Sequence, residues 1–141
     1  MELGLTEVRR QGFAGESLIV LSRSLLEQLS DDPLCDRLYF TDIGIFPRAS
    51  NHRVERERGS GEYVIQFCFD GEGFCTFGGE THEIDAGHYF IVPPGEQHIY
   101  GSRAEGEWQV GWVHFKGASA ERVAAELNRR GYGRPQPMDV S

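Results

Sequence analysis

Turn residues punctuate this chain about every ten residues from Leu38 onward, with short runs of β-branched and aromatic residues between them. Asp-Gly and Gly-Gly pairs between apolar runs are strong signals for β-hairpins. Many short strands at this spacing indicate an all-β sandwich or barrel. The predicted strands are Leu38–Phe46, His52–Glu57, Tyr63–Phe69, Gly73–Phe77, Thr81–Asp85, Tyr89–Val92, Gln97–Ser102 and Gln109–Phe115, with turns at residues 59–61, 70–73, 78–79, 85–87 and 93–95.

Two helices are expected to flank the strands. After a short apolar run at residues 18–21, a short amphipathic helix begins at Ser24 and ends before Pro33, and a second helix covers Ala118–Arg130. We therefore expect an N-terminal arm and short helix over residues 1–37 and a barrel over residues 38–117. Residues 118–141 are expected to form a C-terminal helix and tail.

Composition narrows the class of protein. A chain of 141 residues suits one domain with its own core. Its net charge of −8 opposes binding to nucleic-acid phosphates. No secretory signal and no stretch of membrane-spanning length is apparent, so a cytoplasmic location is expected. Cys35, Cys68 and Cys75 are expected to be free thiols, with a Cys68–Cys75 disulfide across a hairpin as the lesser alternative.

One segment carries a more specific pattern. Residues 87–98 fit G-x5-P-x-G-x2-H, which resembles the second signature of the cupin fold, a double-stranded β-helix. Gly87 permits a tight turn, Pro93-Pro94-Gly95 reverses the chain, and His98 then points into the barrel. The first cupin signature has an H-x-H pair and a Glu, and residues 58–73 lack the histidine pair. His98 alone does not make a metal site, so neither a metal nor another cofactor is expected.

Nearly the whole chain, residues 16–130, resembles the N-terminal domain of AraC-type transcription factors. The most specific pieces are Pro93-Pro94-Gly95-Glu96-Gln97-His98-Ile99-Tyr100-Gly101 and the strand from Glu107-Trp108 to Trp112-Val113-His114-Phe115. The resemblance implies a mainly β, cupin-like jelly-roll barrel with a short N-terminal helix and a C-terminal helix. It also implies an effector-sensing domain that binds a small polar molecule such as a sugar and does not act as an enzyme. DNA binding would then belong to a C-terminal helix-turn-helix domain, and a homodimer is an expected assembly.

Seven residues are predicted to line the barrel. The resemblance aligns Arg56 with a ligand-contacting arginine, Tyr100 with a sugar-contacting tyrosine and Trp112 with a ring-stacking tryptophan. Strand alternation from His98 and Trp112 adds their neighbours two residues away, and alternation from Tyr63 adds two more. The set is Arg56, Val64, Gln66, His98, Tyr100, Trp112 and His114.

Several of these residues also suit a purely structural role without ligand contact. The run around Arg56 alternates in charge like an exposed, salt-bridged strand, and a bulge would turn Arg58 inward instead. Trp112 also suits a core tryptophan that closes the barrel. His52, His82 and His88 are most simply surface or turn residues.

Two other functions stay open at this level. One is a small metal-dependent cupin enzyme that uses His98 and His114 with non-standard partners. The other is a dimerisation scaffold whose barrel is filled by its own side chains.

Overall fold

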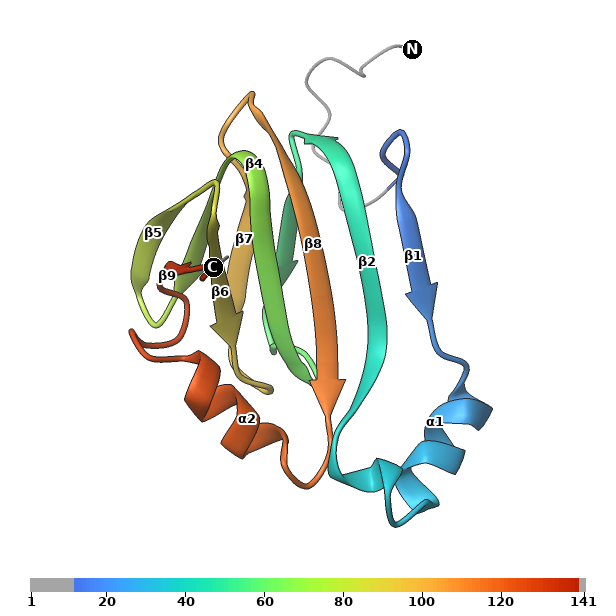
Figure 1. Cartoon of the computed structure of the whole chain (residues 1–141). Coiled ribbons are helices and arrows are strands. Elements are labelled where there is room, and N and C mark those ends of the chain that lie inside the picture. The colour runs from blue at the N-terminus through green and yellow to red at the C-terminus, as the bar shows by residue number, and fades with distance from the viewer. Residues whose placement is uncertain (1–11, 140–141) are drawn as a thin grey trace.

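The structure is a computed structural model that describes residues 12–139 (Figure 1). About half of the described residues are in strands, and a helix lies near each end. The strands are β1 (Ser17–Val20), β2 (Tyr39–Ser50), β3 (Arg53–Arg56), β4 (Tyr63–Phe77), β5 (Glu80–Asp85), β6 (His88–Val92), β7 (His98–Ser102), β8 (Glu107–Lys116) and β9 (Gln136–Pro137). The helices are α1 (Arg23–Asp31), a 3-10 turn η1 (Cys35–Arg37) and α2 (Ala120–Leu127).

The strands form two antiparallel layers that share β4. One layer has the order β1-β2-β8-β4-β6-β9, and in the other β3 pairs with β7, β7 with β4 and β4 with β5. The sheet thereby curls into a half-barrel, with β7 and β3 behind β4 and β8 in the view of Figure 1. This confirms the predicted mainly β, cupin-like class with an N-terminal and a C-terminal helix.

The shared strand corrects one prediction. Residues 70–73 were expected to form a hairpin turn, but β4 runs through them without a break. The pairing with β8 shifts register between Cys68 and Asp70, and Gly71 follows with a φ of 78°. Glycine adopts this left-handed conformation without a steric penalty, so the Asp-Gly pair forms a bulge that bends the strand from one layer into the other. The predicted Gly78-Gly79 hairpin is confirmed, and both glycines have positive φ.

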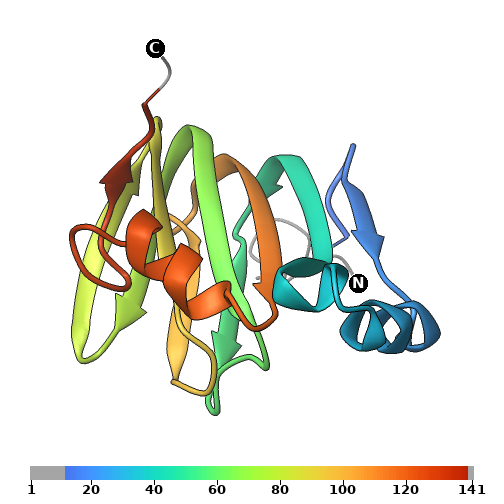
Figure 2. The same cartoon turned by 60° about the horizontal axis from the view of Figure 1, so that its bottom comes forward.

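The main core lies between the two layers. Phe90, Ile84 and Trp108 are almost fully buried there, and the indole Nε1 of Trp108 donates a hydrogen bond to Nδ1 of His52 over 3.0 Å. A second cluster lies on the outer face of the first layer, where Ala120 and Ala124 of α2 pack against Ile65, Ile91 and Phe115. Figures 1 and 2 place α1 and α2 at opposite sides of the same end of the molecule.

The two helices lie close to their predicted residue ranges. Ser22 caps α1 by accepting a hydrogen bond from the backbone N–H of Leu25, and α2 is shorter than predicted at both ends. The apolar run that precedes α1 contributes β1, which pairs with β2.

All three cysteines are unpaired thiols, and burial raises the pKa of Cys75 to about 12. Within residues 12–139, none of the helices has the length and apolar character needed to span a membrane.

Replacing Gly73 by alanine is expected to destabilise the fold. A Cβ there would collide with the Trp108 ring and lie 2.6 Å from the carbonyl oxygen of Gly101. Trp108 is 1% exposed and has no room to move, so we expect a loss of about 1–3 kcal/mol in the free energy of unfolding. Urea denaturation measures the change.

Gly61→Ala is the matched control. Nothing lies within 4 Å of a Cβ at Gly61, so its midpoint should stay within about 0.5 kcal/mol of the parent protein. Equal midpoints for the two variants would contradict the packing described for Trp108.

Candidate ligand-binding cavity

A cavity of about 320 Å³ lies between the two layers and opens to one side. Five of the seven predicted residues line it: Arg56, Gln66, Tyr100, Trp112 and His114. The other lining residues are Leu18, Val20, Asp42, Phe46, His52, Val54, Ser60 and Glu62. Val64 is fully buried in the core instead, and His98 lies behind Arg56.

Arg56 supplies the positive charge of the cavity. One guanidinium nitrogen, Nη1, donates to Nε2 of His98 over 2.9 Å and to the Tyr100 hydroxyl over 3.2 Å. The guanidinium carbon lies 5.5 Å from the centre of the Tyr100 ring, within cation–π range. Arg58 is exposed, so β3 turns Arg56 inward, as the resemblance implied.

His98 is the neutral support of Arg56. A guanidinium only donates hydrogen bonds, so Nε2 of His98 accepts and the ring proton is on Nδ1. Nδ1 then donates to the backbone carbonyl of Glu96 over 3.1 Å. Burial, followed by the charge of Arg56, lowers the pKa of His98 to about 4. The neutral His98 ring therefore holds the Arg56 guanidinium in place by accepting a hydrogen bond, and it adds no second positive charge.

Gln66 leaves a polar atom unsatisfied. Its side-chain Nε2 donates to the Tyr100 hydroxyl over 3.0 Å. Its Oε1 is buried and has no hydrogen-bond partner within the part of the chain that the structure describes. An unpaired buried oxygen costs about 1–3 kcal/mol. A donor from a bound molecule would remove that cost.

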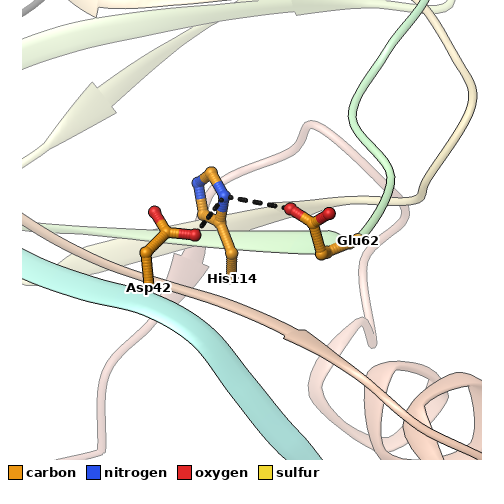
Figure 3. A group of neighbouring side chains, drawn as sticks. All are labelled: Asp42, Glu62 and His114. Atoms are coloured by element: carbon orange, nitrogen blue, oxygen red, sulfur yellow. Dashed lines mark ion pairs between the residues drawn. The ribbon is translucent and has the colours of Figure 1, made fainter. Parts of the chain in front are cut away.

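Three ionisable residues that line the cavity, Asp42, Glu62 and His114, lie next to one another (Figure 3). Nδ1 of His114 lies 3.1 Å from Oδ1 of Asp42 and 3.5 Å from Oε1 of Glu62. Burial lowers the pKa of His114, but its hydrogen bonds to both carboxylates outweigh that effect and raise it overall. The hydrogen bond to His114 lowers the pKa of Glu62, and for Asp42 the same interaction overcomes the opposing effect of burial.

Trp112 connects this ionisable group to the apolar wall. Its Nε1 donates to Oδ2 of Asp42 over 3.2 Å, and its ring lies 4.5 Å from that of Phe46 at an angle of 58°. The ring is only partly buried and borders the cavity, as expected for a surface on which a ligand ring stacks. Leu18 and Val20 of β1 complete this side.

Eight lining residues were not predicted as site residues, and three of them are ionisable: Asp42, His52 and Glu62. His52 was expected at the surface, but it is 3% exposed and its ring contacts Phe46 and Tyr100. It precedes Val54 and Arg56 at every second position, so strand alternation would have identified it. Asp42 and Glu62 had no comparable signal, because their role depends on the register of β2, β4 and β8. His82 and His88 are partly exposed and lie outside the cavity, as predicted.

His98 is expected to remain neutral down to about pH 4, with its proton on Nδ1. In the unfolded chain it would titrate near 6.5, so between pH 6.5 and about 4 the unfolded state binds one more proton than the folded state. The free energy of unfolding should therefore fall as pH falls through this window. Nitrogen-15 NMR of the imidazole rings reports the charge and the tautomer directly.

His98→Gln is the comparison variant. Its unfolding free energy should depend less on pH between 6.5 and about 5.5, which is above the ordinary pKa values of 3.8 and 4.5 from which those of Asp42 and Glu62 are lowered. An imidazolium signal from His98 at pH 6 would show that the assignment of its tautomer is wrong.

Comparison with known proteins is consistent with this arrangement. A family model described as the AraC-like ligand binding domain matches residues 41–140. The MmsAB operon regulatory protein of Pseudomonas aeruginosa is 35% identical over 101 residues, which are 69% of this chain and 33% of that protein. The Arabinose operon regulatory protein of Salmonella typhimurium is 33% identical over 64 residues, 45% of this chain and 23% of that protein. The chain thus spans a third or less of the length of these relatives.

Among solved structures, the plu4264 protein from Photorhabdus luminescens has a TM-score of 0.51 and 11% sequence identity, and the match covers 90% of this chain and 95% of that one. A sequence identity of 11% supports a similar fold and no shared function. The family model covers well over half of the sequence, and its match includes β4, β8 and most of the cavity. The chain belongs to the family of AraC-like ligand-binding domains.

Proposed function

We propose that this chain is the effector-sensing domain of a transcription regulator and that the cavity between its two layers binds a small polar molecule. The observation that carries the proposal is the convergence of Arg56, Gln66, Tyr100, Trp112 and His114 on one cavity, where a buried oxygen of Gln66 has no partner among residues 12–139. Ligand sites of this kind combine apolar walls with a few well-placed polar groups, and about 300 Å³ is the lower end of their usual volume.

The finer proposal is a sugar or a sugar-like polyol as effector. The Trp112 ring would cover the apolar face of a sugar ring, and hydroxyl groups would pair with Arg56, with the Gln66 oxygen and with the carboxylates near His114. One of the relatives is named as a regulator of an arabinose operon, which supports this class of compound. His98 and Val64 would support the site from behind by fixing Arg56 and the adjoining core.

Control of DNA binding would be indirect. The net charge of −8 makes this domain a poor partner for phosphate groups, so DNA would be bound by a helix-turn-helix domain in the rest of the full-length protein, as a homodimer. Coupling requires that the effector bind one arrangement of the regulator more tightly than another. Both relatives are named as regulatory proteins, which supports a sensor and not an enzyme.

A thermal-shift screen of sugars, sugar acids and polyols tests the proposed function. A true effector at about a hundred times its Kd should stabilise the domain by about 2.7 kcal/mol, a rise of several degrees in Tm. The rise should disappear in Arg56→Gln and in Trp112→Ala, because each change removes a contact to the bound molecule.

Arg53→Gln is the matched control for Arg56→Gln. Arg53 lies on the same strand but on its outer face, 3.7 Å from Glu55, so its loss should leave the ligand-induced shift unchanged. The proposal fails if no compound of these classes stabilises the domain, or if the shift persists in Arg56→Gln.

A further inference from the structure

Asp42, Glu62 and His114 form a group whose geometry suits a metal ion. They come from β2, from the loop before β4 and from β8, and one ligand atom of each lies within 4.8 Å of the others (Figure 3). Nδ1 of His114 is 3.1 Å from the Asp42 carboxylate and 3.5 Å from that of Glu62. Ligands held at about 2.1 Å from one metal ion lie about 3.0–3.4 Å apart in octahedral or tetrahedral geometry, which is close to these separations.

The charges in this group also suit a divalent cation. Two carboxylates and one imidazolium leave a net charge of −1 in a part of the cavity where the side chains are only 22%, 25% and 9% exposed, for Asp42, Glu62 and His114 respectively. A divalent ion bound by both carboxylates and a neutral imidazole brings the sum to zero. Binding would release the proton that Nδ1 of His114 otherwise shares with the carboxylates.

Neighbouring donors already hold the carboxylates in place. The Thr41 hydroxyl donates to Oδ1 of Asp42 over 2.9 Å, and the Trp112 indole donates to Oδ2 over 3.2 Å. The Ser60 hydroxyl donates to Oε1 of Glu62 over 3.3 Å. Outer contacts of this kind orient metal ligands in proteins.

Gln66 provides an independent indication. It is 2% exposed, borders the same cavity and has a side-chain oxygen with no partner among residues 12–139. On β4 it pairs with Trp112, and Val64, two residues earlier, pairs with His114, so Gln66 projects from the same face beside the group. An amide oxygen is a suitable additional ligand, or an acceptor for a metal-bound water.

We propose that Asp42, Glu62 and His114 bind one divalent transition-metal ion, of the Zn²⁺, Co²⁺ or Mn²⁺ type, in the wall of the cavity. One imidazole and two carboxylates favour these ions over Mg²⁺ and Ca²⁺, which prefer oxygen ligands alone. The site differs from the cupin arrangement considered for His98, because Nε2 of His98 faces the guanidinium of Arg56 and is not available to a cation. It does not require that the effector be a sugar.

Metal titration of the untagged, metal-stripped protein tests the proposal. We expect one equivalent of Co²⁺ to bind with visible absorption bands of the protein-bound ion, and Zn²⁺ to displace it. Asp42→Asn, Glu62→Gln and His114→Gln should each weaken binding by at least about tenfold. Far-ultraviolet circular dichroism confirms that each variant is folded.

Two control variants show whether another histidine, outside the proposed group, binds the metal ion. His82→Gln removes a partly exposed histidine that lies 3.1 Å from Glu80, a His–carboxylate pair outside the cavity, and should not change binding. His98→Asn should not change it either. The proposal is overturned if no ion binds, if the ion persists in all three variants of the group, or if only His98→Asn abolishes binding.

A measurement on the parent protein does not depend on any variant. The chain has two tryptophans, and only the Trp112 indole N–H donates to a proposed metal ligand. Sub-stoichiometric Mn²⁺ should therefore broaden the NMR signal of the Trp112 indole before that of Trp108, since paramagnetic broadening falls steeply with distance. Equal broadening of both signals, or broadening of Trp108 first, would place the ion elsewhere and overturn the proposal.

Discussion

The continuity of β4 through both layers is the constraint on which the rest of the structure depends. Its first half pairs with β6 and β8, and its second half pairs with β5 and β7. Because one strand belongs to both layers, Gln66 in the first half and Tyr100 opposite the second half are brought within hydrogen-bond distance of each other. The bend at Gly71 therefore turns the second half of β4 into the other layer, where β7 carries Tyr100.

Two groups of opposite charge line the cavity. A histidine that burial keeps neutral holds Arg56, so the positive charge of Arg56 is not cancelled by that partner. In the second group, two carboxylates share one imidazole. A molecule in the cavity would therefore have both hydrogen-bond donors and acceptors within the same lining. An arrangement of this kind selects by the order of polar groups along a ligand as well as by its size.

The all-β class follows from local rules, namely the spacing of turn residues and of β-branched and aromatic runs. The resemblance to AraC-type domains implied that Arg56, Tyr100 and Trp112 border the cavity, and strand alternation added Gln66 and His114. The same alternation, extended back from Arg56, would have added His52. The bend in β4 was missed because an Asp-Gly pair has the same local appearance in a bulge as in a hairpin turn. The group of Asp42, Glu62 and His114 was missed for a different reason. It depends on the register between β2, β8 and the start of β4, which places the loop residue Glu62 beside His114, and no local pattern encodes that register.

The place of β1 at the edge has a consequence for how the cavity exchanges its contents. Among the described strands β1 pairs with β2 alone, and all four of its residues are exposed, yet Leu18 and Val20 form part of the cavity wall. Detaching this strand breaks one ladder and leaves the main core, with Phe90, Ile84 and Trp108, untouched. Local opening of such an element requires much less free energy than global unfolding. Detachment of β1 would therefore widen the opening of the cavity without disturbing the core that Phe90, Ile84 and Trp108 form.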